Sequence, residues 1–144
     1  MNDRLPLPCW EHFEHGADIG IRGMAATLEQ AFEQAALAMT AVISDLDQVS
    51  SSHSVAIDLD GTDAELLFFS WINELIYQMA VSGLLFGRFQ VSIHDGHLSA
   101  KAFGEPIDSL KHQPAVEIKG ATFTELRVCK QDDGSWLAQC VVDV

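Results

Sequence analysis

Basic residues are scarce in this sequence of 144 residues, which holds 8 lysines and arginines against 21 aspartates and glutamates. The net charge of −13 repels a phosphate backbone, so we do not expect the chain to bind nucleic acid on its own. The same charge suits a hard cation or a basic partner surface, because opposite potentials speed and orient encounter. Solubility alone is the alternative explanation of the acidity.

Paired cysteines, a signal peptide and a membrane-spanning segment are also missing. The three cysteines have no paired spacing and no zinc pattern, which favours reduced thiols in a cytoplasmic protein. Residues 1–8 contain no apolar run of signal-peptide length. The most apolar segment, residues 66–81, is interrupted by Asn73, Glu74 and Gln78. It is too short and too polar to span a bilayer, so we expect a buried helix there.

Internal repeats, low-complexity tracts and Pro/Gly-rich linkers are absent as well. The length fits one domain, so we expect residues 1–144 to form a single domain. The sequence has no Gly-rich phosphate loop, no G-x-S-x-G elbow and no H-E-x-x-H motif. These absences leave no common catalytic motif to assign.

Two stretches with helical periodicity are present. Thr27 is the expected N-cap of the first helix, because Gln30 follows three residues later and apolar residues recur at helical spacing to about Val42. A second capping box at residues 62–65 opens another helix, which we expect to end near Gly83.

Alternating apolar residues predict about six strands, most of them joined as hairpins. Tight turns are expected at Asp95-Gly96 and at residues 132–134. The predicted extended runs are residues 18–21, 55–59, 89–93, 98–102, 116–128 and 136–142. Helices segregated from such a sheet predict an α+β domain, built as a two-layer sandwich of two helices on a mainly antiparallel sheet.

Two aspartates are candidates for an ion site. Asp18 has small neighbours that let an ion approach closely, and Asp143 lies beside the last residue, Val144, directly after an apolar strand. If the first and last strands are neighbours, Asp18, Asp143 and the Val144 carboxylate can converge. Such carboxylates repel one another unless a cation lies between them, and oxygen ligands suit Ca²⁺, Mg²⁺ or Mn²⁺. Two unrelated, solvated surface aspartates are the alternative.

Other acidic and histidine patterns are weaker. His12 and His15 are three residues apart in an extended segment, which is too little for a zinc site. Residues 58–63 resemble part of a calcium loop, but the glycine is one place early and the terminal glutamate is missing. Asp63 and Glu65 are better explained by helix capping.

Five motifs in order give the sequence a resemblance to a known family, the archeases. Residues 14–20, Glu-His-Gly-Ala-Asp-Ile-Gly, look like the archease opening, and residues 71–77 look like its central-helix signature. The family order continues with Gly104-Glu105, His112, residues 118–122 and the ending Val142-Asp143-Val144. The resemblance covers about residue 12 to the last residue.

The resemblance implies a function. Archeases assist RtcB-type RNA ligases, which use GTP and Mn²⁺ to join RNA ends in tRNA splicing and RNA repair. An archease has no catalytic residues of its own but promotes ligase guanylylation and multiple turnover. In the family, the opening Asp and the C-terminal Asp with its terminal residue bind a divalent cation, and these correspond to Asp18, Asp143 and Val144.

Three further residues are implied in ligase activation by their place in the motifs, namely Lys119, Glu74 and His15. A solvated strand lysine is the alternative for Lys119, and a cap on a buried polar group is the alternative for Glu74. Phe123-Thr124 stands where the family commonly has Tyr-His, so no role of that pair is carried over. Gly16, Ser70 and Gly120 also depart from the usual residues.

Two other functions remain alternatives. The first is a chaperone-like modulator of other RNA-modifying enzymes. The second is a stand-alone metal-dependent hydrolase that uses Asp18 and Asp143. The hydrolase is disfavoured because no candidate base or nucleophile accompanies the acidic pair.

Overall fold

The computed structural model describes residues 6–144. The expectation that residues 1–8 form no signal peptide therefore falls mostly outside the described residues. In chain order the elements are β1 (Cys9–His15), β2 (Asp18–Ala25), α1 (Leu28–Ile43), the 3-10 turn η1 (Leu46–Gln48), β3 (His53–Asp60), α2 (Ala64–Ser82), β4 (Leu84–His94), β5 (His97–Pro106), α3 (Ser109–His112), β6 (Gly120–Ala121), β7 (Arg127–Lys130) and β8 (Trp136–Asp143).

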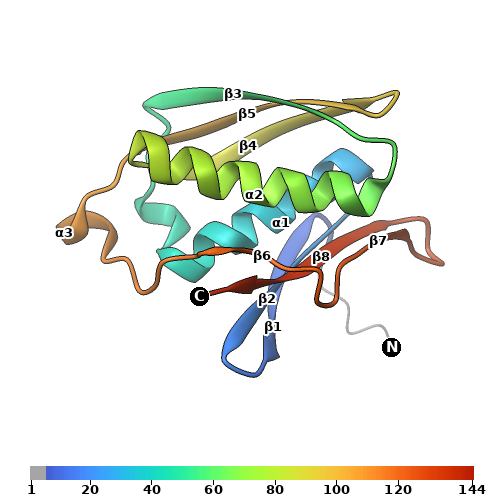
Figure 1. Cartoon of the computed structure of the whole chain (residues 1–144), viewed down its shortest axis with the longest axis horizontal. Helices are drawn as coiled ribbons and strands as arrows, with labels where there is room; N and C mark the ends of the chain where they lie inside the picture. Colours follow the sequence, from blue (N-terminus) through green and yellow to red (C-terminus); the bar gives the residue numbers. More distant parts are fainter. Residues whose placement is uncertain (1–5) are drawn as a thin grey trace.

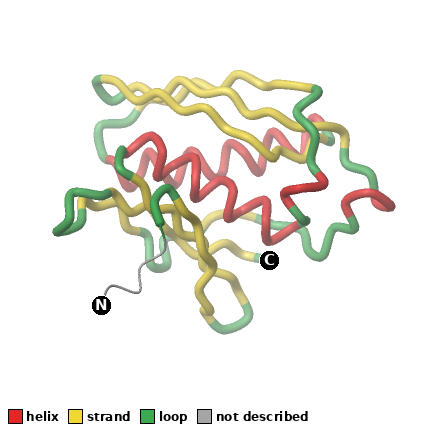
Figure 2. The backbone as a smooth tube through the Cα atoms, turned by 180° about the vertical axis from the view of Figure 1, so that it is seen from behind, coloured by secondary structure: helices red, strands yellow, loops and turns green. Residues whose placement is uncertain are grey.

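The strands form two antiparallel sheets. The larger sheet has the order β1-β2-β8-β6, with β7 also paired to β8, and the smaller has the order β3-β5-β4. Helices α1 and α2 lie between the two sheets (Figures 1 and 2). The α+β class and the antiparallel pairing are confirmed. Residues 6–144 form eight strands in two sheets, where the sequence predicted about six strands in one sheet.

The composition of α1 explains why a sheet covers it on each side. Its buried residues include four alanines and extend around much of the helix. Such a helix must be covered on more than one face, and α1 packs against both β2 and β4. Thr27 is the N-cap as predicted, and its Oγ1 accepts a hydrogen bond from the backbone N–H of Gln30 at 3.2 Å.

Helix α2 is buried on one side and exposed on the other. Trp71 lies in the core, and its Nε1 donates a hydrogen bond to the carbonyl of Phe32 on α1 at 3.1 Å. The N-cap is Asp63, one residue after the predicted capping box begins, because its carboxylate accepts from the N–H groups of Glu65 and Leu66. Gly83 ends the helix with a left-handed φ of 68°, as predicted.

The hairpin predicted at Asp95-Gly96 joins β4 to β5, and both turn residues have positive φ. The alternation predicted over residues 116–128 gives only the short strands β6 and β7, with a loop between them. No helix in residues 6–144 is long and apolar enough to cross a membrane.

Candidate functional site

Strands β2 and β8 lie side by side, which brings Asp18 to the end of the chain. Ile19 is paired with Val142, and continuing that register by one residue places Asp18 opposite Asp143. The backbone N–H of Val144 donates a hydrogen bond to Asp18 Oδ1 at 3.4 Å. The run predicted as the first strand, residues 18–21, is part of β2, and β2 is a neighbour of the last strand, β8, as the predicted convergence requires.

Strand β6 places Lys119 against the other side of this strand end. Gly120 is paired with Asp143, and the backbone N–H of Lys119 donates to the carbonyl of Asp143 at 2.8 Å. The side chains of Lys119 and Asp143 are both exposed. A cationic and an anionic side chain thus flank the same strand end, where a bound partner can reach both.

Asn73 ties α2 to the same strand end, a role that the sequence did not indicate. Its Oδ1 accepts a hydrogen bond from the backbone N–H of Ala121 on β6 at 3.0 Å. This contact holds the central helix against β6, next to the residues that pair with Asp143. A polar residue on an otherwise apolar helix was the available signal, but its partner is 48 positions away in the chain.

Of the remaining histidine and glutamate candidates, only one is shown beside Asp18. His15 is paired with Asp18 across the β1–β2 hairpin and is exposed. His12 does not join it, because its Nε2 lies 2.7 Å from the carbonyl oxygen of Ala38 on α1. Glu74 is half-buried on α2, where its Oε1 accepts a hydrogen bond from Gln78 Nε2 at 2.9 Å.

The donor chemistry of the strand end fits a hard cation. Within residues 6–144, no group of three or more His, Cys, Asp or Glu side chains can hold a metal ion. The predicted set has only two such side chains, Asp18 and Asp143, with Val144 as the third donor, so water would complete the coordination of a cation there. All of these donors are oxygens, which suits Ca²⁺, Mg²⁺ or Mn²⁺.

The segment that resembles a calcium loop has other partners. His97 lies 2.7 Å from Asp60 and 3.2 Å from Asp58, and these two hydrogen bonds, that to Asp60 first, raise the pKa of His97. Asp63 caps α2. The contacts therefore support hydrogen bonding and helix capping as the roles of these acids, in place of a calcium site.

Known proteins resemble the chain over most of its length. The model of the Archease protein family (MTH1598/TM1083) matches residues 10–144. Protein archease of Pyrococcus furiosus is 43% identical over 139 residues, which cover 94% of this chain and 98% of that protein. Protein archease of Sulfolobus acidocaldarius is 38% identical over 137 residues with the same coverage. The chain belongs to the archease family.

Two solved structures share the archease fold. The solution structure of Methanobacterium thermoautotrophicum protein 1598 is 31% identical and has a TM-score of 0.83, covering 94% of this chain and 98% of that one. The crystal structure of an archease from Thermotoga maritima, described as a possible chaperone, has a TM-score of 0.64 at 16% identity. It covers 100% of this chain and 99% of its own, and at that identity it supports the fold alone.

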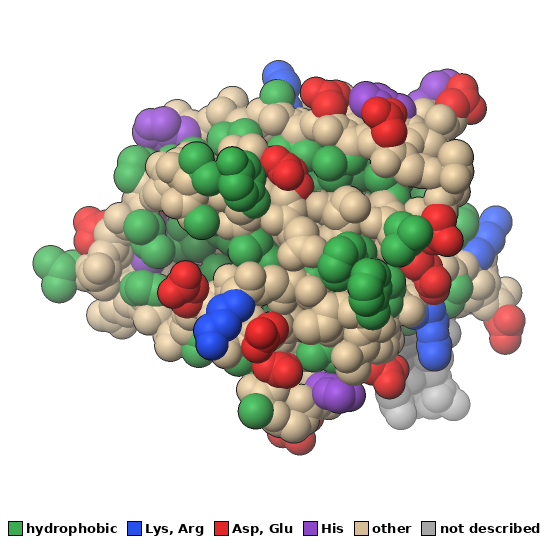
Figure 3. All heavy atoms as spheres, in the orientation of Figure 1, with side chains coloured by type: hydrophobic (Ala, Val, Ile, Leu, Met, Phe, Trp, Pro, Cys, Tyr) green, Lys and Arg blue, Asp and Glu red, His purple; other side chains and the backbone are tan. Residues whose placement is uncertain are grey.

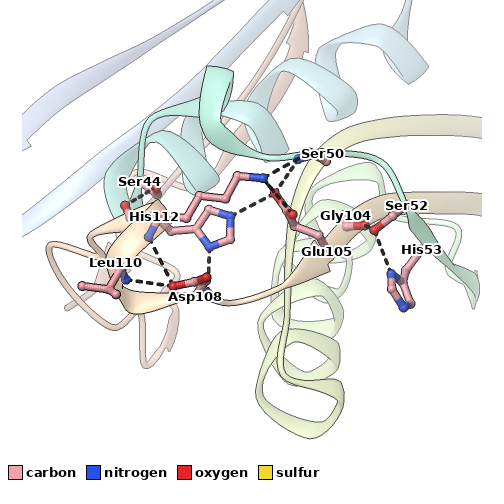
Figure 4. A network of polar contacts seen from close by, with 10 residues as sticks. Ser44, Ser50, Ser52, His53, Gly104, Glu105, Asp108, Leu110 and His112 are labelled. Atoms are coloured by element: carbon pink, nitrogen blue, oxygen red, sulfur yellow. Dashed lines mark hydrogen bonds and ion pairs between the residues drawn. The ribbon is translucent and has the colours of Figure 1, made fainter.

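Glu105 and His112, which belong to the motifs that carry the resemblance, meet in a second polar cluster (Figure 4). Glu105 accepts hydrogen bonds from the Lys111 ammonium at 2.8 Å and from the N–H of Ser50 at 2.7 Å. The Nδ1 of buried His112 accepts from the N–H of Asp108, so its Nε2 carries the proton and donates to Glu105 at 3.0 Å. Lys111 first, then Ser50 and His112, lower the pKa of Glu105 to about 2.

Phe123, to which no role was assigned from the sequence, lies on the outer side of α2. Its ring stacks on Phe69 with centroids 4.4 Å apart, and Phe123 remains 65% exposed. Residues 123–124 thus add an exposed aromatic contact to this side of α2.

Proposed function

We propose that this chain is a non-catalytic activator of a GTP-dependent RtcB-type RNA ligase, and that it promotes ligase guanylylation and multiple turnover. Membership of the archease family supports the proposal. The observation that carries it is the position of Asp18 beside the strand end that holds Asp143 and Val144. An acidic strand end on a chain of net charge −13 is complementary to a pocket built to hold a triphosphate.

Asp18, Asp143 and the carboxylate at Val144 would hold a divalent cation. When bound, that ion supplies positive charge for phosphate oxygens at the tip of an otherwise acidic surface. The chain's own contribution is positional: the N–H of Val144 orients the Asp18 carboxylate, and the N–H of Lys119 fixes the Asp143 backbone.

Lys119 and His15 are exposed beside these acids and are proposed to contact the ligase. For Glu74 the hydrogen bond to Gln78 favours an orienting contact within α2 over a direct contact with the ligase. Lys119 would offer its ammonium to a nucleotide phosphate, since a lysine acts there as a point charge.

The test is a guanylylation and ligation assay with a purified RtcB-type ligase, GTP and Mn²⁺. With RNA ends in excess, the ligase alone should join about one RNA per enzyme, and addition of this chain should give many turnovers. Transfer of labelled GMP to the ligase should rise in parallel. The chain alone should neither join RNA nor cleave phosphoesters, and cleavage by the chain alone would favour the metal-dependent hydrolase.

A chaperone-like modulator of other RNA-modifying enzymes is the second candidate, because the Thermotoga maritima archease is described as a possible chaperone. That function predicts activation of unrelated RNA-modifying enzymes and protection of them from aggregation. Equal effects on an RtcB-type ligase and on such enzymes would favour it.

A further inference from the structure

An apolar groove of about 510 Å³ lies between the C-terminal half of α2 and the segment of residues 107–118. Its lining includes Ile76 and Met79 from the helix, Ile107 and Ile118 from the segment, and one acidic residue, Glu117. In Figure 3 hydrophobic side chains gather around a hollow at the left of the face, near the left, C-terminal end of α2 as it is seen in Figure 1. The volume lies in the range of ligand and peptide-side-chain sites.

The wall opposite α2 is held rigidly. The N–H of Ile107 donates to the carbonyl of Gly83 at 2.9 Å, and the N–H of Ala115 donates to the carbonyl of Ile43 at 2.8 Å. Between these points buried His112 joins the segment to Glu105, and Ser44 Oγ donates to the His112 carbonyl at 2.6 Å (Figure 4). These contacts are made within the chain itself, so the groove is formed without a partner.

The two segments that line this groove also carry large apolar side chains in solvent. Ile107 lines the groove and is 47% exposed, and Leu110 in the same segment is 89% exposed. On α2, Tyr77 and Val81 follow the lining residues Ile76 and Ala80 in sequence and are 59% and 64% exposed. Single exposed apolar residues are ordinary, but several on the segments that form one hollow are typical of a binding surface.

Charge and position indicate what occupies the groove. Glu117 is the charged residue that lines it, and the chain carries a net charge of −13, which opposes a second copy and favours a basic partner. Ile118 lines the groove, and the backbone N–H of the next residue, Lys119, donates a hydrogen bond to the carbonyl of Asp143. One segment therefore runs from the groove to the candidate ion site.

We infer that this groove docks an apolar side chain or short apolar segment of the partner protein, flanked there by lysine or arginine. The inference rests on the proposed function in taking the ligase as that partner. It assigns two separate tasks to the face: the groove supplies affinity, and the strand end with Asp18 and Asp143 supplies activation.

The first test compares Ile107→Lys, which places a cation in the groove, with Leu66→Lys, which makes the same change at a residue 52% exposed near the start of α2. Ile107→Lys should raise the Kd for the ligase at least tenfold, while Leu66→Lys should change it less than about threefold. At saturating concentration Ile107→Lys should still give full guanylylation. Thermal unfolding checks that both variants fold, and Met79→Lys provides a second change in the groove.

The second test needs no ligase. A ten-residue peptide of alternating leucine and lysine is titrated into the labelled chain, and the methyl resonances of Ile76, Met79, Ile107 and Ile118 are followed. The peptide should shift these signals, whereas the same peptide with glutamate in place of lysine should not. Ile107→Lys should remove the effect.

The outcomes separate the two proposals. Peptide binding in the groove without any binding of the ligase would overturn the proposed function and leave the docking site standing. Ligase activation and ligase affinity that are unchanged by Ile107→Lys and Met79→Lys, with no peptide shifts, would overturn the docking site and leave the function standing. Self-association that depends on Ile107 would also overturn the inference, because a second copy would then be the occupant.

Discussion

The Glu105 side chain joins three separate parts of the chain, at Ser50, Lys111 and His112. Its carboxylate is anchored by Lys111, Ser50 and His112, which lower its pKa to about 2 from an ordinary value of 4.5. A carboxyl group whose pKa is lowered by folding stabilises the fold above the unfolded pKa, and that stabilisation is lost as the pH falls through the folded value. Its contribution should therefore fade between about pH 4.5 and about pH 2.

The corresponding variant is Glu105→Gln, which keeps the shape of the side chain and removes its charge. It should unfold at a lower urea concentration than the wild type near neutral pH, and the difference should shrink as the pH falls towards about 2. Glu117→Gln is the control, because the Glu117 side chain has no hydrogen bond among residues 6–144. A difference between wild type and Glu105→Gln that stays constant with pH would contradict the assigned charge.

Residue-level expectations succeeded where chemistry is local. Thr27 and Gly83 follow from capping rules that involve neighbours within one turn. The ion site of Asp18, Asp143 and Val144 stays a prediction, and it depends on the non-local pairing of β2 with β8. The contact of Asn73 was not anticipated, because its partner, Ala121, approaches only when α2 packs on β6.

At the scale of elements, β2 lies so close to α1 that one position admits only glycine. A Cβ at Gly23 would lie 2.3 Å from the carbonyl oxygen of Ala31 and 2.4 Å from the nitrogen of Ala35. Both are backbone atoms of α1, so the helix must move. Gly23→Ala should lower the free energy of unfolding by about 3 kcal/mol, the upper range of overpacking.

Gly61→Ala is the matched change for this prediction. A Cβ there would lie 3.6 Å from the nearest atom, on Leu67, which is an ordinary contact. Its effect should stay within about 0.5 kcal/mol. Chemical denaturation measures both variants, and equal stability of Gly23→Ala and wild type would show that β2 and α1 can separate without loss.

Element types were more predictable than their partners. The Asp95-Gly96 hairpin needed only turn chemistry. The division into two sheets depends on pairings such as β2 with β8 and β3 with β5, which join distant segments and leave no local trace. Residues 116–128 alternate like a strand, yet only the short strands β6 and β7 form, and each pairs with a different part of β8.

Over the whole molecule, the dominant property is the net charge of −13. The chain gains little from counterion release on a phosphate polymer, so it should bind RNA negligibly in a gel-shift assay. Its association with a basic ligase surface should slow steeply as salt rises, because steering is screened over about 8 Å at physiological ionic strength. Dissociation should change less.

Stopped-flow measurements across a salt series give the two rate constants. An association rate that is independent of salt would show that charge does not guide the encounter. Tight RNA binding by the isolated chain would instead point to a direct role on RNA.

The most direct measurement of the central claim is ligase guanylylation in the presence of Asp18→Asn and of Asp143→Asn, with Asp95→Asn as the control. Asp95 is an exposed aspartate with positive φ at the β4–β5 turn, where asparagine fits equally well. Asp18→Asn and Asp143→Asn should each lose most of the activation while their thermal unfolding stays near that of wild type, and Asp95→Asn should activate fully. Full activation by both Asp18→Asn and Asp143→Asn would contradict a metal-bearing strand end as the activating element.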